Sequence, residues 1–169
     1  MPPLIERMIR AAKLDAALYE EVEGNTSLLR EAALIVVIVA LASGIGALTG
    51  GFMGLVWGIV YALAGWALWA GIIYFVGTRL MATSETHADW GQVARGIGYA
   101  QAPGVLRVFG FIPVVGGLIV LAAFIWQIVA VVTATRQVLE LGTTGRAVGV
   151  VVVAAVPYII LTSLFFWLT

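Results

Sequence analysis

The sequence predicts an all-α, polytopic transmembrane helix bundle of about five spans. Of its 169 residues, 62% are hydrophobic and only 11% are charged, and the mean hydropathy is +1.07. Soluble domains carry roughly 25% charged residues, so this composition excludes one. Uncharged stretches long enough to cross a bilayer recur along the chain. We divide it into a cytoplasmic amphipathic segment, residues 1–26, and a membrane domain, residues 27–169.

The N-terminal segment has the apolar periodicity of a helix that lies on the cytoplasmic face of the membrane. Leu4, Met8 and Ala12 recur at helical spacing, in one helix to about Glu23 or in two short ones. Its acidic end is a candidate surface for a protein partner at the cytoplasmic face, although docking onto the protein's own loops is favoured. This acidic patch consists of Tyr19, Glu20, Glu21 and Glu23.

Four stretches have the ordinary length and apolarity of membrane-spanning helices. No residue between Glu31 and Arg79 is charged, and that stretch is too long for one helix and about right for two. Thr49-Gly50-Gly51 is the expected turn between them, because paired glycines accept the backbone angles of a helical hairpin. The four spans cover approximately residues 32–48, 52–78, 112–135 and 147–168.

A third, atypical span is expected at about residues 92–109. Gln101 and Pro103 interrupt its apolar run, so a re-entrant helix pair is the alternative. The distribution of arginine and lysine favours a full crossing, because every basic residue except Arg107 then lies on the cytoplasmic side. The N-terminus is therefore expected in the cytoplasm and the C-terminus outside.

Polar residues at membrane depth form the candidate site, since each is costly in hydrocarbon and is expected to face protein or water. If the helix is continuous, Tyr99, Pro103 and Arg107 share one face at spacings of i, i+4 and i+8. Gln101 and Gln127 fall near the middle of the third and fourth spans. Their amides either bond each other or cap carbonyls freed by the proline. The favoured interpretation is support for a broken helix, and the alternative is a groove for a lipid headgroup or a solute.

Glycine spacing indicates close helix packing. Gly54, Gly58 and Gly65 form a ridge on the second span, and Gly145 and Gly149 begin another on the last. Packing inside the bundle is favoured over an interface in a homo-oligomer.

The spans also carry aromatic residues, among them Trp66, Trp69 and Tyr158. A buried indole N–H requires a hydrogen-bond partner. An aromatic-lined cavity is one interpretation, and ordinary packing is the favoured one.

The sequence contains no recognisable catalytic motif. It has no cysteine and a single histidine, His87, and no phosphate-binding or nucleophile motif. We therefore predict a non-enzymatic protein with no catalytic residues, no metal and no cofactor. The formal net charge of zero argues against nucleic acid as a partner. Membrane lipids are the expected partner.

Several motifs resemble the Yip family of Rab-GTPase-interacting membrane proteins, in its prokaryotic branch. They are residues 13–23, 77–80 and 98–113, together with Trp126 and Arg136-Gln137. The resemblance implies a five-helix membrane bundle with a cytoplasmic N-terminus, in a prokaryotic inner membrane. Gly98, Tyr99 and Pro103 match the family's Gly-Tyr-x-x-x-Pro pattern.

The function that this resemblance implies is non-enzymatic, in membrane organisation or trafficking through interaction with protein or lipid. Eukaryotic members contact prenylated Rab GTPases, and this sequence lacks their Asp-Leu-Tyr-Gly-Pro motif. The alternative is a transporter, channel or lipid scramblase that uses a polar groove beside the third and fourth spans.

Overall fold

The computed structural model describes residues 3–47 and 51–168, and all regular secondary structure in that part of the chain is helical. The prediction of an all-α membrane bundle is confirmed. The elements in chain order are α1 (Leu4–Ala12), α2 (Ala16–Gly24), η1 (Thr26–Leu28), α3 (Leu29–Ala47), α4 (Gly51–Phe75), η2 (Val76–Leu80), α5 (Trp90–Tyr99), η3 (Ala102–Phe111), α6 (Gly116–Val138) and α7 (Thr144–Leu168). The elements η1 and η3 are 3₁₀ helices, and η2 is one turn of π-helix.

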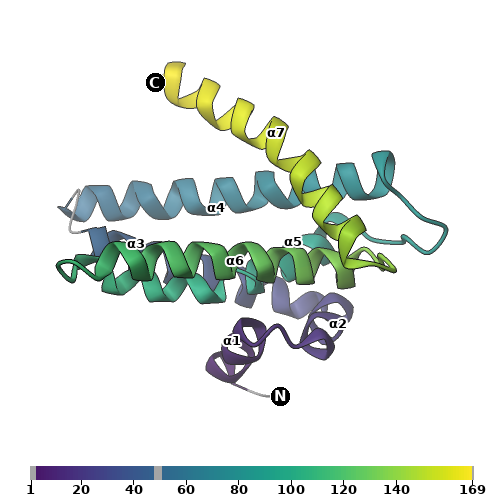
Figure 1. Ribbon diagram of the computed structural model, residues 1–169, viewed down its shortest axis with the longest axis horizontal. Helices are drawn as coiled ribbons and strands as arrows, with labels where there is room; N and C mark the ends of the chain where they lie inside the picture. Colours follow the sequence, from purple (N-terminus) through teal and green to yellow (C-terminus); the bar gives the residue numbers. More distant parts are fainter. Residues whose placement is uncertain (1–2, 48–50, 169) are drawn as a thin grey trace.

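Four helical segments of the described chain are long and apolar enough to cross a membrane. They are α3 with η1, α4 with η2, α6 and α7, close to the four ordinary spans expected from the sequence. In Figure 1, α3, α4 and α6 run along the long axis of the molecule, whereas α7 leans away from them toward its C-terminal end.

The ends of the first two spans are set by local turn chemistry. Asn25 begins the 3₁₀ turn before α3, because its side chain accepts a 3.1 Å hydrogen bond from the Ser27 N–H. Of the turn expected between α3 and α4, Thr49 and Gly50 lie outside the described residues. Gly51 has φ +55°, a left-handed conformation that glycine adopts without strain.

The atypical third segment is not one continuous helix. Asp89 and Gln92 form a capping box that starts α5, and α5 ends at Tyr99. After a turn the chain continues as the 3₁₀ helix η3, with Pro103 in its first turn, where the missing N–H costs no helical bond. A 3₁₀ helix rises about 2.0 Å per residue, so α5 and η3 together extend about 35 Å if collinear. The tighter helix thus lengthens a segment that would be short as α-helix.

The third segment lies beside α3 and runs in the same direction. Gly98 faces Ala32 near the start of α3, Gly104 faces Val39, and Gly46 lies against the backbone of Arg107 near the end of α3. A β-carbon at Gly98 would lie 2.7 Å from the Ala32 side chain, and one at Gly104 would lie 2.7 Å from that of Val39. The two segments therefore pack with backbones in close approach along most of α3.

The N-terminal segment forms two short helices, α1 and α2, as one of the two sequence alternatives allowed. Leu14 joins them with φ +61°, and the Asp15 carboxylate caps α2 by accepting from the Ala17 N–H at 3.0 Å. Figure 1 shows this N-terminal hairpin (α1 and α2) against one side of the bundle. Leu18 and Val22 are fully buried in this contact.

Bundle side chains complete the hydrogen bonding of the hairpin helices. Trp126 Nε1 donates to the Ala12 carbonyl at the end of α1 at 2.8 Å. Arg95, which is only 3% exposed, donates from Nε to the Val22 carbonyl at 2.9 Å and from Nη2 to the Glu23 carbonyl. A guanidinium at a helix C-terminus also interacts favourably with the negative end of the helix dipole. The hairpin is thereby docked on the protein itself.

Candidate functional site

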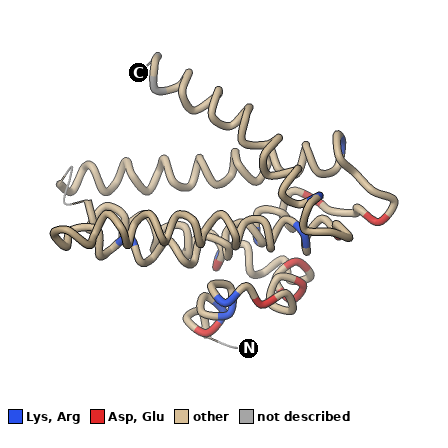
Figure 2. The backbone as a smooth tube through the Cα atoms, viewed as in Figure 1, with Lys and Arg blue, Asp and Glu red and all other residues tan. Residues whose placement is uncertain are grey.

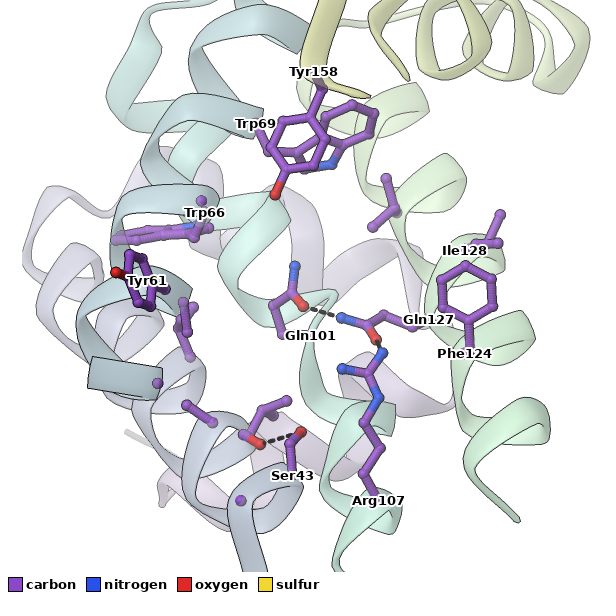
Figure 3. A pocket seen from close by; sticks show the side chains of 18 of the residues that line it. Ser43, Tyr61, Trp66, Trp69, Gln101, Arg107, Phe124, Gln127, Ile128 and Tyr158 are labelled. Atoms are coloured by element: carbon purple, nitrogen blue, oxygen red, sulfur yellow. Dashed lines mark hydrogen bonds between the residues drawn. The ribbon is translucent and has the colours of Figure 1, made fainter. Parts of the chain in front are cut away.

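A cavity of about 890 Å³ lies among α3, α4, η3, α6 and α7 (Figure 3). Its volume is in the range of small-molecule sites, and its lining is mostly apolar with a few polar groups. Ser43 of α3 and Ala62 of α4 have small side chains and Gly58 of α4 has none, which leaves this space open. Because most of its walls are membrane-spanning helices, the cavity lies at the depth of the hydrocarbon.

Three of the five residues predicted as a site meet in this cavity, and all three are polar. Arg107 Nη2 donates to Gln127 Oε1, and Gln127 Nε2 donates to Gln101 Oε1 (Figure 3). The amides thus bond each other, which was the first of the two expected arrangements. An arginine inside a membrane span is costly, by up to about 2.5–3.5 kcal/mol at the centre of a helix, and the Gln127 carbonyl offsets part of the cost for Arg107. This Arg107–Gln127–Gln101 chain connects η3 to α6.

Aromatic side chains form the wall opposite Arg107. Trp69 and Tyr158 meet edge to face with ring centroids 5.1 Å apart. Trp66 donates its indole N–H to the Ala94 carbonyl at 3.0 Å, which satisfies the polar end of the ring. Figure 3 shows the Tyr158 hydroxyl directed into the cavity. Sequence reasoning favoured ordinary packing for these rings, and the structure instead brings them together around a cavity.

The cavity opens at the outer surface of the bundle between helices. Phe124 and Ile128 of α6 and Val152 of α7 line it and are also exposed, Val152 by 59%. All three are apolar and lie inside helices long enough to span the membrane. A mouth with such a rim faces lipid chains rather than water, because exposed apolar residues at that depth are solvated by lipid.

Tyr99 and Pro103, the other two predicted residues, lie outside the cavity. Tyr99 is fully buried and donates its hydroxyl to Glu31 Oε1. Pro103 is buried at the start of η3, where it supports the change from α- to 3₁₀-helix. Pro103 therefore lies at the helix break, whereas Gln101, Arg107 and Gln127 line the cavity. Support for a broken helix and a groove for a lipid or solute both stay predictions for these residues. Gly98 acts in packing against α3.

A buried ion pair, which the sequence did not reveal, joins the hairpin to α3 beside Tyr99. Arg7 Nη1 donates to both Glu31 carboxylate oxygens at 2.7 Å, and Arg7 is only 3% exposed. Hydrogen bonding to this carboxylate raises the pKa of Arg7. Arg7 Nε also lies 3.5 Å from Glu21 Oε1. The spacing of the apolar residues in α1 predicted a buried face. Arg7 lies on that face, but the sequence did not indicate which residue pairs with it.

Most residues of the acidic patch make contacts within the protein. Tyr19 is fully buried and donates to the Ala11 carbonyl at 3.3 Å. Glu21 pairs with Arg10 at 2.9 Å, and Glu23 accepts from Gln92 Nε2 at 3.4 Å. Only Glu20 is left exposed without a pair in the described part of the chain. A protein partner at this face remains a prediction.

Glu23 has a strongly shifted carboxyl group. Burial is the main cause, and the negative charges of Glu140, Glu20 and Asp89 add to it, while Arg95 opposes them; the pKa of Glu23 rises to about 7. Between the ordinary value of 4.5 and about 7, the folded protein then binds more protons than the unfolded chain. The contribution of Glu23 to stability is full at low pH and is lost as the pH rises through this window.

We therefore expect Glu23→Gln to reduce the loss of thermal stability between pH 5 and pH 8. Melting temperatures of the detergent-solubilised protein at pH 5 and pH 8 would measure this loss of stability. Glu85→Gln, in the exposed loop before α5, is the matched control and should keep the wild-type slope. An unchanged slope in Glu23→Gln would show that this carboxyl group does not titrate in that window.

Four glycines of the predicted ridges, Gly58, Gly65, Gly145 and Gly149, have no backbone of another helix within 4 Å of a β-carbon. A β-carbon at Gly58 or Gly145 would meet nothing within 4 Å, and Gly54 and Gly58 line the cavity instead. Gly65 leaves room for the Tyr158 hydroxyl, and Gly149 approaches only the end of the Met81 side chain. At Gly65 and Gly149 the contact is with a side chain of another segment, and the preference for packing inside the bundle over a homo-oligomer interface stays a prediction. Close packing occurs at glycines of α3, α5, η3 and α6 that the spacing rule did not select.

No group of three or more histidine, aspartate or glutamate residues that could hold a metal occurs in the described ranges. His87 is exposed in the loop between η2 and α5. The cavity is lined by one charged side chain, Arg107, together with amides, hydroxyls and apolar groups. Such a lining favours binding over acid–base chemistry.

The four long apolar helices define a multi-pass integral membrane protein. A family model described as the Yip1 domain matches residues 16–165, and the chain belongs to this family. The resemblance to the Yip family is thereby confirmed, whereas its prokaryotic branch remains a prediction. No curated protein and no solved structure matches the chain significantly.

Proposed function

We propose that this Yip1-family protein acts without catalysis, by holding a membrane lipid in the lateral cavity and thereby organising the surrounding membrane. The observation that carries the proposal is the mouth of the cavity. Phe124, Ile128 and Val152 form an exposed apolar rim at hydrocarbon depth, and the polar Arg107–Gln127–Gln101 chain lies inside. An amphipathic lipid has the same arrangement of apolar chains and a polar headgroup. A trafficking role, which the family resemblance implied, is compatible with this binding.

We further propose that the third segment crosses the membrane, giving five spans with the N-terminus inside and the C-terminus outside. Its parallel course beside α3 supports the crossing, because α3 is itself long enough to span. Figure 2 shows the charged residues gathered mainly at one end of the bundle and in the N-terminal hairpin. That distribution is typical of a cytoplasmic end rich in arginine.

Filling the cavity should remove the bound lipid. Gly58→Phe places a ring in the space, because a β-carbon there meets nothing within 4 Å. We expect wild-type protein purified in mild detergent to retain phospholipid, seen by native mass spectrometry, and Gly58→Phe to lose most of it. Gly145→Phe, at an equally open glycine outside the cavity, should retain it. Wild-type protein that carries no lipid would contradict the proposal.

Lipid scrambling is the second candidate, because a polar chain inside a lateral cavity is what a translocated headgroup needs. The chain ends at Gln101, however, and fully buried Ala130 and Ala134 follow toward the cytoplasmic end of α6. Passage of a headgroup requires polar surroundings across the whole hydrocarbon. We expect liposomes containing the protein to show no faster flipping of a fluorescent phospholipid than empty ones. Rapid flipping that Gln127→Leu abolishes would favour the scramblase instead.

A further inference from the structure

The cavity contains a positive charge without a counter-charge. Arg107 is the one charged residue of its lining, and no carboxylate in the described part of the chain lies within 4.0 Å of its guanidinium. Its hydrogen-bond partner, Gln127, is a neutral amide. By contrast, Arg7 and Arg10 in the hairpin are both paired with carboxylates. A lone guanidinium in a low-dielectric site attracts an anion strongly.

The direction of the Arg107 side chain keeps this charge inside the cavity. Arg107 lies about 8 Å from the end of η3 at Phe111, at about 2.0 Å per residue. An arginine side chain is long enough to reach the interface from that depth, as snorkelling arginines do. Here it extends instead toward Gln127, which lies about 16 Å into α6 from Gly116 (Figure 3). The side chain is therefore placed for a ligand within the cavity.

The other polar groups in the cavity also favour an acceptor ligand. Gln101 uses its oxygen to accept from Gln127, and its nitrogen points away from that bond, toward the aromatic wall (Figure 3). The Tyr158 hydroxyl faces the same space, and the missing side chain at Gly65 makes room for it. Arg107, Gln101 and Tyr158 thus offer N–H and O–H donors, and no acidic side chain lines the site. Donors without carboxylates match a phosphate group.

We propose that the cavity selects an anionic phospholipid, with Arg107 binding the headgroup phosphate and the acyl chains leaving through the apolar mouth. This inference rests on the proposed function and specifies the class of lipid. A lipid with one net negative charge neutralises Arg107. A zwitterionic lipid brings its own ammonium group, for which the cavity provides no carboxylate.

The test compares phosphatidylglycerol and phosphatidylcholine with identical acyl chains on the delipidated, folded protein. Native mass spectrometry measures the occupancy of each lipid at equal concentration. We expect phosphatidylglycerol to be preferred at least tenfold. Arg107→Gln should remove the preference, Arg107→Lys should keep part of it, and Arg146→Gln, at the exposed start of α7, should keep all of it. The wild-type comparison decides the question even if Arg107→Gln fails to fold.

The outcomes separate this inference from the proposed function. Equal occupancy by both lipids would overturn the selection for charge and leave lipid binding in place. If neither lipid bound, both the inference and the proposed function would be overturned. A further outcome is that inorganic phosphate or glycerol 3-phosphate competes with bound phosphatidylglycerol as effectively as free phosphatidylglycerol does. That result would show a site for free anions and overturn the assignment to a lipid. Preference for phosphatidylcholine would point to the aromatic rings as the headgroup site and also contradict the proposal.

Discussion

Replacing Glu31 with alanine is expected to lower the free energy of unfolding by about 3 kcal/mol. The substitution leaves the Arg7 guanidinium, only 3% exposed, without its bidentate carboxylate, and it removes the acceptor of the Tyr99 hydroxyl. Breaking a buried ion pair from one side costs roughly 3–5 kcal/mol. The lower end applies because the Glu31 side chain keeps 21% exposure. Denaturation of the detergent-solubilised wild type and variant with sodium dodecyl sulfate would measure the difference in the free energy of unfolding.

Two further variants separate the ion pair from its surroundings. Arg7→Met combined with Glu31→Gln leaves no buried charge, so we expect it to recover much of the loss. Arg10→Ala removes a more exposed arginine that pairs with Asp15 and Glu21, and it should cost no more than about 1 kcal/mol. Equal costs for Glu31→Ala and Arg10→Ala would mean that the buried pair has no special role in docking the hairpin.

Gly46→Ala is expected to destabilise the bundle by about 3 kcal/mol and to displace Arg107. A β-carbon at Gly46 would overlap the carbonyl group of Arg107 and crowd the backbone of Gly110 at 3.2 Å. Because the added methyl group meets backbone rather than a flexible side chain, the clash cannot be relieved by a rotamer change. The loss of stability is therefore expected at the upper end of the roughly 1–3 kcal/mol that overpacking costs. Because η3 must move, lipid occupancy should fall together with stability.

Gly58→Ala is the matched substitution on the neighbouring helix. A β-carbon there meets nothing within 4 Å, and alanine favours helix by up to about 1 kcal/mol over glycine. We expect unchanged or slightly increased stability under the same denaturant. A similar loss in both variants would show that glycine serves helix flexibility in this bundle rather than close approach of backbones.

The membrane bundle was predictable because the signals for it are additive along the chain. Each long apolar stretch reports its own span, and no tertiary contact is needed to recognise it. The third segment was recognised as unusual from Gln101 and Pro103, but its 3₁₀ form follows from packing beside α3. Gly46 and Gly98 make that packing, and their partners lie far away in sequence. A spacing rule within one helix does not detect such pairs.

The polar residues of the cavity were predicted in part for a similar reason. Charge and polarity at membrane depth singled out Arg107, Gln101 and Gln127, since such groups rarely face lipid. Tyr99 shares a helical face with Arg107 only in a continuous helix, whereas α5 ends at Tyr99, whose hydroxyl donates to Glu31. The aromatic wall depends on the contact between Trp69 of α4 and Tyr158 of α7, which no local pattern encodes.

Photoactivatable phosphatidylglycerol, with a diazirine on the acyl chain, tests lipid occupancy of the cavity most directly. After illumination in bilayers, mass spectrometry locates the cross-linked residues. We predict adducts at cavity residues that face the interior, such as Ser43, Ala40 and Ala62, and their loss in Gly58→Phe. Adducts confined to exposed positions outside the cavity, such as Val60 and Ile125, would contradict the account.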